Sequence, residues 1–394
     1  MNAVLRTDGT LMLVAQTISI AQSATISASG TTATAPKGGA NGNYESGGGA
    51  NADHAMPHPG VPGAATCTLA AYGCAPVSGG KGGGMLALVA RRILVAGTLA
   101  ADGTVGPAGA NGGEASPDSG PYSPGPGGGG GSGGGILLAA TEAQVTGRLS
   151  VAGGAGGPPG SVDPDGGSPA SKGAAGSSGL IKVFVSTLHT TSNVLPVTGQ
   201  AFLSGRLPVD PTPPDLSVPH LYEAATMHNL EGPFLAFWQQ NGGLATFGYP
   251  RTEAFTETGV LEQYTDRALL QLHGGTVQMA SLGTLLLAGR HLATVAPFTP
   301  SKQDLYFPST RHSLSGQFLA FWQSHHGSVL LGTPISEPLT EGNGDGSGRR
   351  YLLQWFEKGR VEVHPEATNT QYAMQLGLLG VQALQARGWL PASK

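Results

Sequence analysis

The sequence predicts a mostly β protein built in two different ways. We expect an N-terminal glycine-rich right-handed parallel β-helix (a solenoid) over residues 1–205 and a C-terminal α+β tandem-repeat domain over residues 221–394. Three observations support this fold class: apolar segments recur between glycine-rich stretches, a long pattern is duplicated later, and the composition changes between the halves. Forty-five of the 65 glycines precede residue 206, whereas all four tryptophans follow it, which indicates two domains.

Four apolar segments of strand length recur in the first half, beginning near residues 11, 85, 136 and 180. They are rich in aliphatic and β-branched residues and are bounded by glycine. Burying one aliphatic side chain stabilises a fold by about 1.5–3 kcal/mol, while ordering each residue's backbone costs about 1–2 kcal/mol. One segment therefore cannot fold alone. Stacking the segments through backbone ladders, with loops of unequal length between them, is typical of a solenoid.

The insertions between these segments, residues 31–84 and 104–135, consist mostly of Gly, Ala, Pro, Ser and Asn. Such a composition is typical of flexible loops. The alternative is that runs such as residues 127–135 pack as extended polyglycine strands, because glycine has no side chain to hold neighbouring backbones apart. The runs lack a strict three-residue period, and we therefore favour loops.

The two cysteines bear on the compartment in which the protein works. Cys67 and Cys74 have six residues between them, and a local disulfide would fit an oxidising exterior, the alternative being two free thiols. Residues 1–4 lead almost directly into the first apolar segment without a signal peptide, so we expect a truncated start or a missing upstream segment. We expect an extracellular or cell-surface location.

Charge and hydropathy argue against two classes of partner. Charged residues make up 11% of the chain and the net charge is −4. The basic residues form no cluster beyond Arg91-Arg92 and Arg349-Arg350, so we expect no nucleic-acid partner. No apolar run approaches the roughly 20 residues that span a bilayer, so we expect no membrane span.

The first half offers few candidates for catalysis or metal binding. Enzymes built on β-helices cluster carboxylates and basic side chains on one sheet face, and the apolar segments contain almost none. Residues 163–167, DPDGG, lack the further oxygen ligands of a calcium loop. His54 and His58 have metal-like spacing only in a helix, which Pro57 disfavours. We expect no metal and no cofactor.

A proline-rich stretch separates the two halves. Residues 206–220 contain five prolines, and such a segment is typically stiff and extended. We therefore expect a spacer between the domains.

A duplication fills the second half, with copies over about 221–300 and 305–394 and a shift of 84 residues between their first parts. The matching stretches are 234–239 with 318–323, 243–253 with 327–337, and 263–273 with 354–364. So many identities in register predict two copies of one small unit. The second copy carries an extra GNGDGSG at residues 342–348, which we place at a hairpin turn, where added length costs little.

Each copy is expected to be a small α+β unit. Phe234, Phe237 and Trp238 have the spacing of one helix face, and this helix should stop at Gly242-Gly243. Strands should follow around residues 253–256, 260–264 and 268–273. A closing helix should cover residues 277–288 in the first copy and 371–386 in the second.

The duplicated pattern resembles a known repeat family. Each copy contains FLAFW, then GGLATFGYPRTE or GSVLLGTPISE, and then QYTDRALLQLH or QWFEKGRVEVHPE. This order resembles the LGFP-type repeats of bacterial surface proteins and is closer still to a related extracytoplasmic repeat common in Chloroflexota. The resemblance implies non-catalytic attachment to cell-wall or other surface polysaccharide. The first half is similar to the glycine-rich parallel β-helix regions of bacterial surface proteins in composition and strand rhythm.

Six residues of the repeats are candidates for ligand binding. The four aromatic residues among them could stack on sugar rings, although Trp238 and Trp322 also fit the core of the predicted helices. Tyr249, which precedes Pro250 in a turn, is the better surface candidate. The six candidates are Tyr249, Trp238, Trp322, Glu253, Glu337 and Trp355.

Glu253 and Glu337 recur at matching positions, as do His273 and His364. Hydrogen bonds within a turn or hairpin explain such repetition better than catalysis does, because no nucleophile motif accompanies these residues. We therefore expect a secreted or surface protein without enzymatic activity, whose repeats bind cell-wall or extracellular polysaccharide. The alternative is a β-helix polysaccharide lyase or glycoside hydrolase with appended binding repeats.

Overall fold

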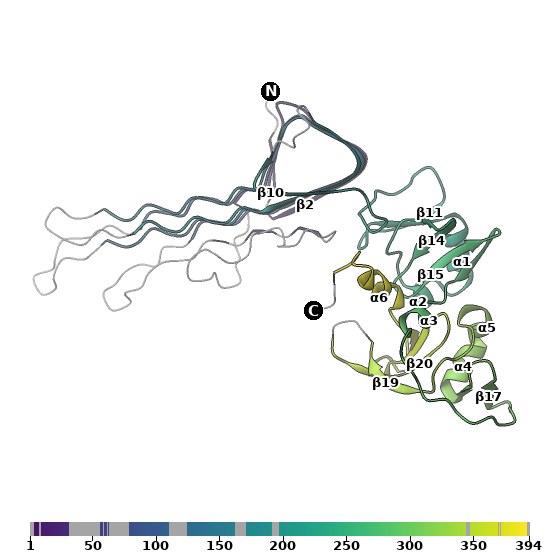
Figure 1. The fold of residues 1–394 in the computed structure, drawn as a ribbon. Helices are drawn as coiled ribbons and strands as arrows, with labels where there is room; N and C mark the ends of the chain where they lie inside the picture. Colours follow the sequence, from purple (N-terminus) through teal and green to yellow (C-terminus); the bar gives the residue numbers. More distant parts are fainter. Residues whose placement is uncertain are drawn as a thin grey trace, which may run out of the picture. The chain divides into compact units, whose positions relative to one another are not determined.

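The structure is a computed structural model (Figure 1). It describes residues 4–7, 9–30, 56–57, 59–60, 62, 79–109, 124–161, 171–190, 197–343, 347–368, 370 and 372–391. The chain divides into two compact units, Met1–Arg206 and Leu207–Lys394.

The larger sheet of the first unit is built from the four recurring apolar segments. Its long strands are β2 (Thr10–Ile20), β4 (Met85–Val95), β6 (Gly135–Val145) and β8 (Leu180–Thr190). All four are parallel and in register, so that their first residues lie side by side across the sheet. The short strand β10 (Gln200–Ser204) pairs with β8 in parallel and forms one edge.

A second sheet is formed by the short strands that follow. These strands are β1 (Val4–Arg6), β3 (Thr25–Ser27), β5 (Thr98–Ala100), β7 (Arg148–Ser150) and β9 (Val197–Thr198). They pair in parallel in the order β1-β3-β5-β7-β9. One apolar core joins the two sheets, with Leu88 and Leu138 contributed by the long strands and Leu99 and Leu149 by the short ones, all fully buried.

The predicted right-handed parallel β-helix is wrong. The recurring segments do stack as parallel strands, but they belong to two separate five-stranded sheets. After each of β5 and β7 the chain leaves the sheets along a glycine-rich segment and returns to the next long strand (Figure 1). No third strand closes a turn in the part of this unit that the structure describes. The first half is mostly β without being a solenoid of closed turns.

The glycine-rich segments next to the sheets are hydrogen-bonded to one another, and we call residues 80–84, 101–109, 124–134, 151–161 and 171–179 the glycine arms. Gly103, Gly106 and Gly109 donate their N–H groups to carbonyl oxygens of the arm 151–161 at 2.8–2.9 Å. A bond at every third residue matches the three-residue turn of an extended polyproline-II-type helix. The expected flexible loops are therefore wrong for these residues, and the packed polyglycine alternative is correct.

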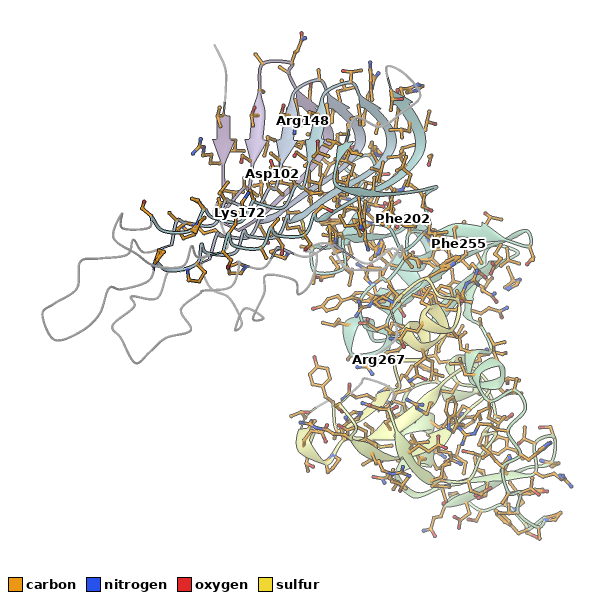
Figure 2. The ribbon with its side chains drawn as sticks, turned by 60° about the vertical axis from the view of Figure 1, so that its left-hand side comes forward. Asp102, Arg148, Lys172, Phe202, Phe255 and Arg267 are labelled. Atoms are coloured by element: carbon orange, nitrogen blue, oxygen red, sulfur yellow. The ribbon has the colours of Figure 1, made fainter. Side chains whose placement is uncertain are left out.

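Glycine is required in the arms because the backbones are almost in contact. A Cβ atom on Gly130 would lie 2.0 Å from the carbonyl oxygen of Gly154, and one on Gly106 would lie 2.0 Å from that of Gly128. Neither distance is compatible with a side chain. Asp102 lies where one arm leaves the sheets (Figure 2), and its carboxylate accepts hydrogen bonds from the Ser150 hydroxyl and the Ala152 N–H group.

The proline-rich segment belongs to the second unit and is not a free spacer. Val209 is buried in the core of that unit, and the Pro208 carbonyl accepts a hydrogen bond from the Glu253 N–H group at 2.8 Å. The Asn229 side chain donates to the Pro213 carbonyl at 3.0 Å. The spacer prediction fails because the carbonyl groups of this extended segment bind the first copy.

The second unit contains the two predicted copies. The first copy consists of β11 (His220–Glu223), β12 (His228–Glu231), α1 (Gly232–Gln240), α2 (Gly243–Phe247), β13 (Phe255–Glu257), β14 (Val260–Tyr264), β15 (Leu269–His273), β16 (Thr276–Met279) and α3 (Leu282–Leu286). The second consists of β17 (Asp304–Phe307), β18 (His312–Ser315), α4 (Gly316–Ser324), α5 (Gly327–Leu330), β19 (Leu339–Gly342), β20 (Arg350–Trp355), β21 (Arg360–Val363), a 3₁₀ turn (Pro365–Ala367), β22 (Met374–Leu376) and α6 (Leu379–Ala386). Each copy has a hairpin, two short helices, a four-stranded antiparallel sheet and a closing helix.

Most predicted elements of the copies are confirmed, and the extra residues 342–348 do lie between the first two strands of their sheet. The closing helices are shorter than predicted, because the residues before them form the fourth strands β16 and β22. A second short helix, α2 or α5, follows each first helix and was not predicted. It begins after a residue in the left-handed region, Gly242 (φ 97°) or His326 (φ 51°).

The two copies pack reciprocally. The N–H group of Thr284 in α3 donates to the Glu357 carbonyl of the second copy at 3.0 Å, and that of Val381 in α6 donates to the Asp266 carbonyl of the first copy at 3.1 Å. Phe234 and Phe318 belong to one apolar core shared by both copies. The copies therefore form one folded unit in which each closing helix caps the sheet of the other copy.

Candidate functional site

The repeated glutamates anchor the first hairpin of each copy. The Glu253 carboxylate accepts hydrogen bonds from the Asn229 N–H group at 2.9 Å and from His228 Nδ1 at 3.3 Å. In the second copy the Glu337 carboxylate accepts the same bonds from Ser313 and His312, at 2.9 and 3.2 Å. These contacts give both glutamates the hairpin role that sequence reasoning favoured over catalysis.

The repeated tryptophans tie each first helix to the following turn. The Trp238 indole N–H group donates to the Gly248 carbonyl at 3.0 Å, and Trp322 donates to the Gly332 carbonyl at 2.9 Å. Both rings are half-buried beside the shared core. Tyr249 is also half-buried, and its backbone N–H group donates to the Asp266 carboxylate at 2.8 Å. These three candidates therefore lie within the repeated framework.

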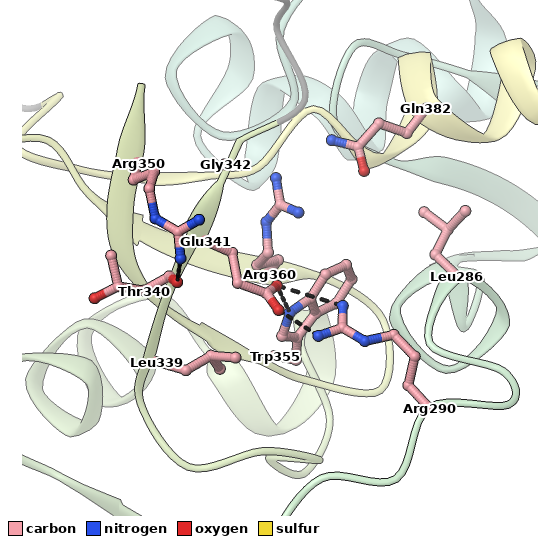
Figure 3. Close-up of a pocket in the computed structure, with 10 residues that line it drawn as sticks. All are labelled: Leu286, Arg290, Leu339, Thr340, Glu341, Gly342, Arg350, Trp355, Arg360 and Gln382. Carbon is pink, nitrogen blue, oxygen red and sulfur yellow. Dashed lines mark hydrogen bonds and ion pairs between the residues drawn. The ribbon is translucent and has the colours of Figure 1, made fainter. Parts of the chain in front are cut away.

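A pocket of about 530 Å³ opens on the second copy, and we call it the copy-2 pocket. Figure 3 shows Trp355 at its centre, with Arg290 and Arg350 reaching towards it from opposite sides. Its wall combines β19, β20 and β21 of the second copy with the chain around α3 and with α6. The lining residues are Leu286, Arg290, Leu339, Thr340, Glu341, Gly342, Arg350, Trp355, Arg360 and Gln382.

Two ion pairs fix the walls of the copy-2 pocket. Arg290 pairs with Glu341, whose carboxylate also accepts a hydrogen bond from the Trp355 indole at 3.1 Å. Arg360 lies over the Trp355 ring, 4.7 Å from its centroid, and donates to the buried Glu362 carboxylate through Nε at 2.8 Å. A cation held against an aromatic face is stabilised by the ring's negative potential. Trp355 is therefore clamped between charged groups.

The Glu341 carboxyl is held in its charged form. Burial alone would raise its pKa, but hydrogen bonds from Arg290 and Trp355 and the nearby charges of Arg290 and Arg360 together lower it. At neutral pH the pocket therefore presents a carboxylate acceptor beside guanidinium donors. The Gln382 side chain adds an amide, which donates to the Asn343 carbonyl at 2.6 Å.

The corresponding place in the first copy is filled by side chains. Arg387 pairs with Glu257 through two hydrogen bonds, at 2.8 and 2.5 Å, as Arg290 pairs with Glu341 in the second copy. Phe255 packs between Tyr264 and Trp389, with ring centroids 6.3 and 5.5 Å away. The same place in the duplicated fold is therefore filled by side chains in the first copy and is an open pocket in the second.

The open pocket follows from a few replacements between the copies. Leu339 stands where the first copy has Phe255, so the second copy lacks one ring. Arg360 stands where the first copy has the buried Leu269. An arginine at a position where the other copy has a buried leucine is a signal that the duplication itself could have provided.

Of the six residues singled out from the sequence, only Trp355 lines the copy-2 pocket. The structure brings it together with Arg290, Arg350, Arg360 and Gln382, which sequence reasoning missed. Cys67, Cys74, His54, His58 and residues 163–167 lie outside the described residues.

Charged side chains described in the first unit bind neighbouring groups of that unit. Over the residues that the structure describes there, Glu142 pairs with Arg92 at 3.5 Å on the exposed side of the large sheet, and Asp102 binds backbone and hydroxyl groups of the next segment. Among the described residues of the whole chain, no three His, Cys, Asp or Glu side chains are grouped to hold a metal ion.

Comparison with protein-family models and with curated proteins finds no match to this chain. No helix within the described ranges is both long and apolar enough to cross a bilayer.

Proposed function

We propose that the second unit binds cell-wall or extracellular polysaccharide through the copy-2 pocket, as the non-catalytic attachment part of a secreted or cell-surface protein. The copy-2 pocket is the observation that supports this proposal. Its volume of about 530 Å³ falls within the roughly 300–1,000 Å³ of small-ligand sites. Its lining is mainly polar, unlike that of a site for an apolar ligand.

The chemistry of the lining suits sugar hydroxyl groups. A hydroxyl both donates and accepts hydrogen bonds, and the pocket offers guanidinium donors beside the Glu341 carboxylate, the Gln382 amide and the Thr340 hydroxyl. The Trp355 indole is buried beneath these groups and holds Glu341 in place through its N–H group. The resemblance of the repeats to polysaccharide-attaching surface repeats agrees with this chemistry.

The first unit has a structural role in this proposal. Its strands carry few charged side chains in their described parts, and its arms are held by backbone hydrogen bonds.

Binding can be tested by affinity electrophoresis of the full chain through gels that contain neutral or acidic polysaccharides. The informative variant is Leu339→Phe, which introduces the ring that fills the first copy. We expect the wild type to be retarded by at least one polysaccharide and Leu339→Phe to migrate freely. Leu216→Phe, at a position that is 74% exposed and does not line the pocket, is the control and should be retarded like the wild type.

Two results would contradict the proposal. One is free migration of the wild type in every polysaccharide tested. The other is equal retardation of Leu339→Phe and the wild type, provided that the tryptophan fluorescence of the variant shows an intact second unit.

A further inference from the structure

Over the residues that the structure describes, the copy-2 pocket has one more cationic side chain than it has carboxylate partners. Three guanidinium groups, those of Arg290, Arg350 and Arg360, line it. The first is paired with Glu341 and the third with Glu362. Over the described residues, no carboxylate forms an ion pair with Arg350, whose guanidinium donates to the Thr340 carbonyl. Among the described residues, Arg350 is therefore the pocket cation without a carboxylate partner.

Arg350 is also placed to meet a ligand. It begins strand β20 two residues after the extra stretch 342–348, is exposed, and pairs with Gly342 across the hairpin. In Figure 3 its guanidinium lies beside Thr340, on the side of Trp355 away from Arg290. The residue at the corresponding position of the first copy is Gly259, so the charge appears only in the copy whose pocket is open.

A guanidinium presents several N–H donors in a planar fork that matches a carboxylate or phosphate group. One excess charge best fits a ligand that carries one negative charge. A sugar acid meets this condition, since its carboxylate would face Arg350 while its hydroxyl groups face Glu341 and Gln382.

We propose that the copy-2 pocket selects an acidic sugar residue, a uronic acid within a polysaccharide, and that Arg350 binds its carboxylate. This inference rests on the proposed function, because it names the ligand class of the same site. It separates the roles of the lining residues: Arg290 and Arg360 shape the walls, and Arg350 provides selectivity.

Isothermal titration of the full chain with polygalacturonate and with its fully methyl-esterified form tests this inference, because the two polymers differ only at the carboxyl group, which is charged in the acid form and neutral and methylated in the ester. We expect binding of the acid form and at least about tenfold weaker binding of the ester. Arg350→Gln should weaken binding of the acid form by about 10- to 100-fold, the loss typical of a charge-assisted hydrogen bond. Lys302→Gln removes one exposed charge outside the pocket and should leave the affinity unchanged. Added salt should weaken binding to the wild type more than binding to Arg350→Gln, because salt screens the attraction between exposed charges.

The failures are distinguishable. Equal binding of acid and ester would overturn the acidic-sugar inference and leave polysaccharide binding intact. If Arg350→Gln binds the acid form as the wild type does, the assignment of Arg350 is wrong. If galactose 6-phosphate binds more tightly than galacturonate, the group that Arg350 binds is a phosphate and not a carboxylate, and the inference is overturned. No binding of any polymer or monomer would refute the proposed function and this inference together.

Discussion

The packing of the glycine arms can be tested at one buried position. Gly130 lies in the arm 124–134, and its N–H group donates to the Ala174 carbonyl at 2.8 Å. In Gly130→Ala the new Cβ atom would lie 2.0 Å from the Gly154 carbonyl oxygen and 2.7 Å from that of Ala155. No rotamer change can relieve these contacts, because all the atoms involved belong to the backbone or are directly bonded to it. The arms must therefore separate.

The expected cost follows from three terms. Forcing one extra carbon into a packed interior costs about 1–3 kcal/mol, and losing the hydrogen bond to Ala174 adds about 0.5–1.5 kcal/mol. The smaller conformational freedom of alanine in the unfolded chain offsets about 0.4–1 kcal/mol. Gly130→Ala should therefore lower the free energy of unfolding of the first unit by about 0.5–4 kcal/mol.

The chain provides both a control and a way to observe the two units separately. At Gly205 an added Cβ atom would meet no other atom within 4 Å, and the backbone there does not have a positive φ, so Gly205→Ala should stabilise by about 0.4–1 kcal/mol. All four tryptophans lie in the second unit. Urea unfolding followed by far-UV circular dichroism should show the loss in Gly130→Ala, while the tryptophan fluorescence transition stays unchanged. If Gly130→Ala and Gly205→Ala have the same stability, the hydrogen-bonded arms do not exist as described.

Two further predictions concern the second unit. Hydrogen bonds from His364 and Tyr351 lower the pKa of Glu366 from 4.5 to about 2. Burial lowers the pKa of His364, but its bonds to Glu362 and Glu366 raise it above 6.5 overall. The stability that Glu366 contributes should be present above pH 4.5 and lost as the pH falls towards 2, whereas that of protonated His364 should be lost as the pH rises above 6.5. The urea midpoint of Glu366→Gln, compared with the wild type across this range, should lack the change at low pH and show a smaller change above pH 6.5, because the contact between His364 and Glu362 remains. Parallel pH curves of the variant and the wild type would contradict the assignment. The buried Gln354 side chain donates to the Ser313 and Ser336 carbonyls, both at 2.8 Å. Gln354→Leu leaves these two acceptors unpaired and should lower the free energy of unfolding of the second unit by about 2–4 kcal/mol. An unchanged urea midpoint, followed by tryptophan fluorescence, would refute this role.

The second unit could be predicted well because its pattern is local and repeated. The helix spacing of Phe234, Phe237 and Trp238 and the alternation of the following strands survive duplication, and each copy supports the interpretation of the other. The lengths of the closing helices could not be predicted in the same way. The turns of α3 and α6 are set by contacts with the other copy, such as the bond from Thr284 to Glu357, which no local pattern contains.

The glycine arms did leave a signal in the sequence. Residues 103, 106 and 109 are all glycine, as are residues 173, 176 and 179, so the three-residue period is present in these two arms. The three-residue period is hidden in arms with several close neighbours, such as 124–134, because more than one face of the extended arm must then be free of side chains. A continuous glycine run and a glycine at every third residue therefore meet the same requirement: each face of an arm that contacts another backbone must be free of side chains.

No local sequence pattern predicts the copy-2 pocket. It exists because Arg290, from the chain after α3, and Gln382, from α6, meet the second sheet, and because Leu339 is too small to fill the space that Phe255 and Trp389 fill in the first copy. Sequence reasoning searched for repeated residues, whereas this pocket is formed by residues that differ between the copies.

The number of binding sites per chain tests the central claim most directly. Titration of the full chain with a short oligogalacturonate gives this number without reference to any variant. One site per chain is the predicted result, because the first copy's equivalent position is filled. Two equivalent sites, or none, would contradict the account.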